Sequence, residues 1–190
     1  MPPKVRIKKE EIINTAVELV RANGEGAMNA RTLASALQCS TQPIFSNFAA
    51  MEKLREAVIF AAYERYYGFL QSEVESGKYP PYKAFGMAYV RFAMEEKELF
   101  KLLFMRDRTG EDTAVSPDFE ESVQMIMKAN GITEERARRM HLEIWTCVHG
   151  IGAMIATSFL SFDWEMISEM LTDVYQGIRT RHVSEEKFEK

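Results

Sequence analysis

The sequence is poor in the features that mark membrane and secreted proteins. No apolar run approaches the roughly 18 residues that a membrane span requires, and the N-terminal segment MPPKVRIKKEE lacks the apolar core of a signal peptide. Only two cysteines, Cys39 and Cys147, occur in 190 residues. We therefore expect a cytoplasmic protein with no membrane partner, in which both thiols stay reduced and form no disulfide.

Motifs for catalysis and for metal or cofactor binding are also missing. The chain contains no glycine-rich phosphate loop and no nucleophile motif. His141, Cys147 and His149 fall in one expected helix, but they lack the four-residue spacing that puts two ligands on one face. We therefore expect no enzyme activity, no metal site and no cofactor.

Six prolines leave long stretches of the chain free to form helix, and no strand-like alternation or internal repeat is present. Hydrophobic residues make up 46% and charged residues 27%, as in globular proteins with a sizeable core. The pattern predicts an all-α protein, as one compact unit or two closely joined ones. We expect helices at residues 8–23, two short ones within 29–48, and then 51–76, 82–95, 96–105, 118–130, 133–160 and 163–182. Residues 106–117 are expected to form an exposed loop, and the charged tail after His182 is expected to fray.

Charge is distributed unevenly along the chain. Residues 1–60 hold eight Lys and Arg against six Asp and Glu, a net charge of +2, so the other 130 residues carry −6 of the total of −4. Lys4, Arg6, Lys8 and Lys9 precede the first acidic residue. These residues form a short basic arm, which is suited to contact DNA phosphates or the minor groove. The alternative is that they belong to a frayed, solvated terminus.

The stretch from Asn29 to Phe48 predicts two short helices joined by a tight corner. Asn29 is placed to cap the first helix, and Ser40 is placed to open the second, with Pro43 in its first turn. Apolar residues occupy one side of these helices, while the second helix also carries polar residues: Thr41, Gln42, Ser46 and Asn47. The apolar face can therefore pack against a core while the polar face recognises a partner.

This segment resembles the helix-turn-helix of the TetR family of bacterial transcriptional regulators. The resemblance covers about residues 8–57 and rests on small and apolar core positions, an aromatic end of the second helix and the start of a long fourth helix, namely Ala34, Cys39, Ile44, Phe45, Phe48 and MEKL at 51–54. Farther on, the spacing W-x-x-x-H-G of Trp145, His149 and Gly150 resembles the start of one C-terminal domain variant of the family.

Three positions depart from the family pattern. Gln38 stands at the corner where Gly is common, Phe45 stands where many members have Tyr, and Met51 stands where Lys is frequent. We expect Gln38 to tolerate a left-handed backbone less easily than Gly. Because Phe45 and Met51 cannot bind phosphate as Tyr and Lys do, Lys53 and Arg55 are candidates to bind it in their place.

The resemblance implies nine helices, with a DNA-binding domain at residues 1–50 and a helical ligand-binding and dimerisation domain at residues 51–190. The DNA contacts that it implies are Arg31, Thr32, Thr41, Gln42, Pro43, Phe45, Ser46, Asn47 and Lys53. Because Gln can pair with adenine and Thr can contact the thymine methyl, we expect A·T pairs in each half-site. An ordinary helical hairpin in a core is the alternative for this segment.

The resemblance also implies an effector pocket and a dimer surface. The expected pocket residues are Tyr63, Tyr67, Phe85, Tyr89, Phe92, Phe104, Met125, Trp145 and His149, for which core packing is the alternative. The expected dimer residues are Gly152, Ala153, Ala156, Trp164, Met170 and Val174, with glycines that permit close helix approach either between subunits or within one.

Together these features predict a ligand-responsive transcriptional repressor. It would bind a palindromic operator in double-stranded DNA as a homodimer, and a small apolar or amphipathic effector would release it. The alternative is an all-α ligand-binding or scaffold protein whose helix-turn-helix is vestigial and has no specific DNA target.

Overall fold

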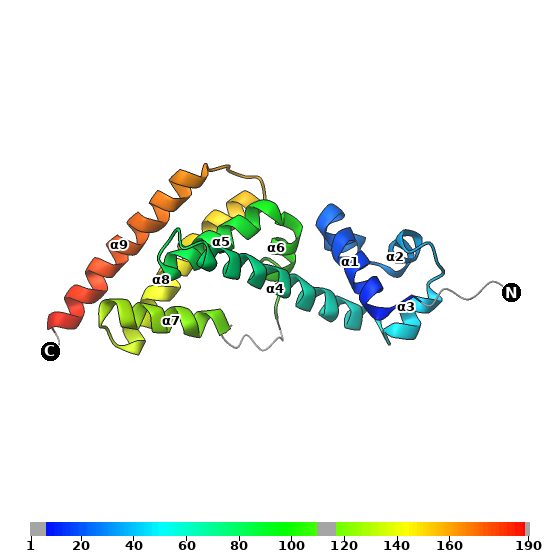
Figure 1. The fold of residues 1–190 in the computed structure, drawn as a ribbon, viewed down its shortest axis with the longest axis horizontal. Helices are drawn as coiled ribbons and strands as arrows, with labels where there is room; N and C mark the ends of the chain where they lie inside the picture. The colour runs from blue at the N-terminus through cyan, green and yellow to red at the C-terminus, as the bar shows by residue number, and fades with distance from the viewer. Residues whose placement is uncertain (1–6, 110–116, 189–190) are drawn as a thin grey trace. The chain divides into compact units, whose positions relative to one another are not determined.

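The computed structural model describes residues 7–109 and 117–188, with side chains omitted at 117–118 and 185–188, and these residues form nine α-helices and no strand (Figure 1). The prediction of an all-α fold is confirmed. In chain order the elements are α1 (Lys9–Asn23), the 3-10 helix η1 (Glu25–Ala27), α2 (Ala30–Ala36), α3 (Gln42–Asn47), α4 (Met51–Glu75), α5 (Pro81–Glu95), α6 (Lys97–Phe104), α7 (Pro117–Asn130), α8 (Glu134–Ala156) and α9 (Trp164–Phe188). No described helix combines the length and the apolar character needed to cross a membrane.

The helix boundaries largely follow the stop signals in the sequence. Gly24 ends α1 with a φ of 78° and Gly131 follows α7 with a φ of 66°, values that glycine adopts at little cost. Residues 110–116, in the expected loop, and Lys4 and Arg6, in the expected basic arm, lie outside the described residues.

Two helix ends were predicted wrongly. α8 stops at Ala156 rather than near residue 160, because Ser158 takes a φ of 56° and the Phe159 N–H bonds back to the Met154 carbonyl at 2.9 Å. α9 continues to Phe188, past the expected end at His182. The residues beyond His182 include no Gly or Pro and are rich in Glu and Lys, which are good helix formers.

The chain divides into two compact units, each with its own core. The first unit contains Met1–Tyr67 and Glu96–Arg106, and the second contains Gly68–Glu95 and Asp107–Lys190. α4 is one uninterrupted helix that supplies residues to both units. The expected domain boundary at residue 50 falls inside the first unit.

The core of the first unit joins α1 to α6, which is distant in sequence. Ile12, Leu33, Leu54 and Phe100 have no exposed surface and come from four different helices. Near them the buried carboxylate of Glu96 binds arginines of α1 and α4. The short helices α2 and α3 are thus held against a core that includes a much later segment of the chain.

The second unit is built around α8, which contacts α5, α7 and α9. Its fully buried side chains include Met87, Phe92, Met140 and Ile167. Gly86 permits close packing of α5, because a Cβ there would lie 3.2 Å from the Leu171 Cδ1 atom of α9.

Candidate functional site

α2 and the corner after it form the first half of the predicted helix-turn-helix. As predicted, Asn29 caps α2, since its Oδ1 accepts the Thr32 N–H at 3.0 Å. Gln38 takes a φ of 52°, and the next residue, Cys39, donates its N–H to the Ala34 carbonyl at 2.9 Å. This six-residue closure is the bond of a Schellman helix end. Gln38 therefore adopts the left-handed backbone in which a glycine would be less strained.

α3, the second helix of the motif, begins later than predicted. Its N-cap is Thr41 and not Ser40, because the Thr41 carbonyl accepts the first backbone bonds, from Ile44 and Phe45 at 3.1 and 3.3 Å. Thr41 itself has helical backbone angles and makes no side-chain cap bond. Pro43 lies in the first turn, where its missing N–H leaves no unsatisfied group.

α3 has a buried side and an exposed side. Ile44 is fully buried and Phe48 is 3% exposed, whereas Phe45 is 51% exposed. Gln42 is also exposed, and its side chain makes no hydrogen bond to any part of the chain that the structure describes. Ser46 and Asn47 differ from it, since their side chains bond to the backbone carbonyls of Gln42 and Pro43 at 2.9 and 2.8 Å. The Gln42 side chain can therefore bind a partner without first breaking a hydrogen bond within the described residues.

Exposed cations precede and follow α3 in the chain. Arg31 and Lys53 are exposed, and the Lys53 ammonium makes a surface ion pair with Glu56 at 2.7 Å, which water and salt weaken. Arg55 is more buried and is bound to Glu25. Of the two candidate phosphate ligands, Lys53 is thus the one that can exchange its partner. Thr32 is half-buried next to Arg31.

Six of the nine expected pocket residues fall into two aromatic clusters, one in each unit. In the first unit the Tyr63 ring lies 6.4 Å from Tyr67 and 6.2 Å from Phe104. Tyr66, which was not predicted as a pocket residue, is 4% exposed and packs edge-on to Phe104 at 5.3 Å. Its position three residues after Tyr63 is the helical spacing that places it near the same face.

The cluster in the second unit is centred on His149. The Tyr89 hydroxyl lies 2.8 Å from His149 Nδ1, and the Trp145 ring stacks on the imidazole at 5.0 Å. Burial lowers the pKa of His149, which favours the neutral imidazole. Of the remaining expected residues, Phe92 is buried and packs against Phe69, while Phe85 and Met125 are half-buried.

A second tyrosine–histidine pair lies two helical turns away on the same helices. The Tyr82 hydroxyl is 2.9 Å from His141 Nδ1, and the Phe119 ring meets His141 edge-on at 4.6 Å. Burial raises the pKa of the Tyr82 hydroxyl above its ordinary value. This pair was not predicted from the sequence, although Tyr82 and His141 precede Tyr89 and His149 by seven and eight residues and so repeat the first pair.

The expected dimer residues divide by burial. Gly152 and Ala156 are buried within the chain, whereas Ala153, Trp164, Met170 and Val174 are half-exposed. Large apolar side chains also reach the surface of α8 and α9, with Leu142 at 51%, Trp145 at 41% and Met166 at 47% exposure. The dimer surface stays a prediction, and these exposed residues extend it.

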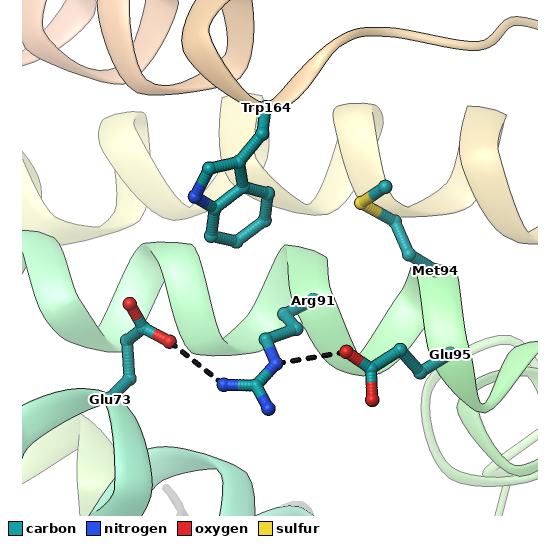
Figure 2. A pocket seen from close by; sticks show the side chains of 5 residues that line it. All are labelled: Glu73, Arg91, Met94, Glu95 and Trp164. Carbon is teal, nitrogen blue, oxygen red and sulfur yellow. Dashed lines mark hydrogen bonds and ion pairs between the residues drawn. The ribbon is translucent and has the colours of Figure 1, made fainter. Parts of the chain in front are cut away.

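A surface hollow of about 370 Å³ lies in the second unit. Figure 2 shows its five lining side chains, which are Glu73 from α4, Arg91, Met94 and Glu95 from α5, and Trp164 from the start of α9. Arg91 lies between the two carboxylates. Of these five residues, only Trp164 was named as a candidate from the sequence. The others were not, because the sequence does not show which side chains of α4 and α5 lie together.

In the part of the chain that the structure describes, no three His, Cys, Asp or Glu residues are arranged to hold a metal ion. Cys39 and Cys147 are both free thiols. Burial raises the pKa of the Cys147 thiol, which disfavours its reactive thiolate.

Comparison with known proteins gives a family for a segment that lies mostly in the second unit. No curated protein matches the chain. Residues 82–175 match the family described as tetracyclin repressor-like, C-terminal domain. The match begins in α5 and runs through α6, α7 and α8 into α9, so it includes both tyrosine–histidine pairs. Through this domain the chain belongs to the TetR family of regulators.

Proposed function

We propose that this TetR-family protein is a ligand-responsive repressor that binds a palindromic operator as a homodimer and acts by binding, without catalysis. The observation that carries the proposal is the geometry of α2 and α3. A capped helix, a left-handed corner at Gln38 and a second helix with a buried Ile44 side leave Gln42 exposed and unbonded within the described residues.

DNA binding would use two kinds of contact. Gln42, in the first turn of α3, is suited to bidentate pairing with adenine in the major groove. Arg31 and Lys53 are suited to phosphate, because both are exposed cations and the Lys53 ion pair with Glu56 is weak. Phosphate contacts would supply most of the affinity, and the base contacts would supply the specificity.

Effector response would depend on the second unit. The Tyr89, His149 and Trp145 cluster combines aromatic surface with polar atoms, as sites for small amphipathic molecules do. α4 runs without a break from Met51 to Glu75, so a ligand that changes its conformation at one end acts on both units. Such a ligand regulates DNA binding only if its affinity differs between the two states.

Selection from a random pool of duplex DNA, followed by titration of the winner across a salt series, tests the proposal. We expect a palindromic consensus, with log affinity falling linearly in log salt concentration. Gln42→Ala should weaken binding to the consensus by about 1–3 kcal/mol and relax the preference at its base pair. Gln124→Ala, which truncates an exposed glutamine of α7, is the matched control and should bind normally.

Weak binding without a consensus would overturn the proposal. So would a Gln42→Ala variant that binds the selected operator as tightly as the parent chain. Either result would favour the alternative of a ligand-binding or scaffold protein that keeps a helix-turn-helix without a specific DNA target.

A further inference from the structure

The hollow in the second unit carries chemistry that DNA binding does not use. Its volume of about 370 Å³ is within the range of small-molecule sites. Three of its five lining side chains are charged, which favours a polar ligand. The two carboxylates and one guanidinium give the lining a net charge of −1.

Glu73 is the buried charge of this hollow. Its side chain is only 7% exposed, and its carboxylate has one ion pair, with Arg91 Nη1 at 3.2 Å. Within the described residues the carboxylate has no other polar partner. Since a buried carboxylate is costly unless several donors surround it, Glu73 has unused capacity to accept hydrogen bonds from a ligand.

Arg91 does not fill that capacity, because its guanidinium is shared among three groups. Its Nε donates to Glu95 Oε1 at 2.9 Å, and its guanidinium carbon lies 5.3 Å from the Phe69 ring centroid. The hydrogen bonds to the two carboxylates raise the pKa of Arg91, so it stays charged and in place. An anion entering the hollow would meet two carboxylates around one arginine that is already paired.

The rest of the lining is apolar and aromatic. The Trp164 indole projects from the start of α9 toward the charged side chains of α5, and Met94 stands on the same side of the hollow (Figure 2). An indole face attracts cations, and a thioether adapts its shape to a bound apolar group. The hollow thus offers negative charge at one side and an aromatic surface at the other.

We propose that this hollow binds a small amphipathic organic cation with N–H donors, such as a protonated primary amine on an aromatic body. The ammonium group would donate hydrogen bonds to the Glu73 carboxylate, Glu95 would add negative charge to the same lining, and the aromatic body would lie against Trp164 and Met94. The site stands apart from the proposed DNA binding, because all its residues belong to the second unit and its occupancy is measured directly.

Three probes with the same body and different charges test the proposal: 2-phenylethylammonium, 2-phenylethanol and phenylacetate. The chain has two tryptophans, so a Trp145→Phe background leaves Trp164 as the reporter of occupancy by fluorescence. Titration calorimetry on the unaltered chain measures the same affinity independently. We expect saturable binding of the ammonium probe, at least about tenfold tighter than binding of the alcohol, and no binding of the carboxylate.

Charge-neutral variants locate the site. Glu73→Gln should weaken binding of the ammonium probe by about tenfold or more. Glu75→Gln makes the same change at an exposed position of the same helix and should leave the affinity unchanged. If Glu73→Gln loses its helical circular dichroism, the affinity of Glu95→Gln for the ammonium probe tests the site instead. The Glu95 side chain is 53% exposed, so its replacement does not disturb the core.

Several results would overturn the proposal. These are equal affinity for the ammonium and the alcohol, absence of saturable ammonium binding up to about 10 mM, and equal loss of affinity in Glu73→Gln and Glu75→Gln. Because none of these measurements involves DNA, a failure here leaves the operator-binding test unaffected, and a failure of that test leaves this one unaffected.

Discussion

Glu96 shows how one buried carboxylate organises the first unit. Its side chain is 4% exposed, and it accepts hydrogen bonds from Arg21 of α1 at 2.6 and 2.8 Å and from Arg65 of α4 at 2.7 Å. The hydrogen bonds to this carboxylate raise the pKa of the Arg21 guanidinium above its ordinary value. Glu96 directly precedes α6, so the network ties three helices together.

We predict that Glu96→Gln lowers the free energy of unfolding by about 2 kcal/mol. This is less than the cost of removing one partner of a fully buried ion pair, because both arginines are partly solvated. Urea denaturation followed by circular dichroism measures the change. Glu18→Gln is the matched control, since Glu18 binds the same Arg21 from a position 63% exposed. The control should lie within about 0.5 kcal/mol of the parent chain. Equal stability of both variants would contradict a structural role for Glu96.

His149 predicts a pH dependence of stability. Burial lowers its pKa from the ordinary value of 6.5 in the folded chain. Below pH 6.5 the unfolded chain takes up a proton at this position that the folded chain does not, so the free energy of unfolding falls as the pH drops from 6.5 through the lowered pKa. His149→Gln removes the titrating group, so the variant should lose less stability than the parent over this range.

Urea denaturation at pH values from about 7 down to about 5 measures the effect of His149. Tyr89→Phe is the companion variant, because it removes the hydroxyl bonded to His149 and leaves the imidazole in place. It should lower stability by about 1 kcal/mol at neutral pH and keep the decline toward acid. Parallel pH profiles for His149→Gln and the parent chain would refute the assignment.

At the scale of an element, the corner between α2 and α3 carries backbone strain at Gln38. Its φ of 52° is a left-handed value that costs a residue with a Cβ about 1–2 kcal/mol. We predict that Gln38→Gly stabilises the protein by about 0.5–1 kcal/mol, after the entropy cost of glycine in the unfolded chain is subtracted.

Thermal unfolding of Gln38→Gly measures this gain. Ala36→Gly is the control, because Ala36 is exposed within α2 and should lose about 1 kcal/mol on the same change. A loss of stability in both variants would mean that the Gln38 side chain contributes more than its backbone strain costs. Neither substitution alters Gln42, so the operator preference should be unchanged.

The whole molecule is predicted to be a dimer through α8 and α9. Met170 is half-exposed on α9, which also carries the exposed Met166, and Leu142 is exposed on α8. In a two-fold symmetric dimer each substitution acts twice, so Met170→Glu should weaken association by at least about 100-fold. Met105→Glu, an exposed methionine of the first unit, is the control. Sedimentation equilibrium measures both, and a parent chain that sediments as a monomer would refute the dimer.

Local chemistry explains which elements were predicted correctly. The Asn29 cap, the glycine ends of α1 and α7 and the length of α4 depend on neighbouring residues, so the sequence shows them directly. The start of α3 was missed by a residue or two because Ser40 and Thr41 are both capping types, and only the backbone bonds choose between them. The ends of α8 and α9 were missed because no strong stop signal marks them.

The sequence by itself determined the all-α class and the order of the helices, because helical periodicity, caps and turns are properties of neighbouring residues. Only the tertiary structure decided which side chains meet. The Glu96 network joins residues 75 positions apart, the tyrosine–histidine pairs join α5 to α8, and the charged hollow joins α4, α5 and α9. Such contacts arise when helices pack, and their residue types resemble ordinary core or surface residues until packing brings them together.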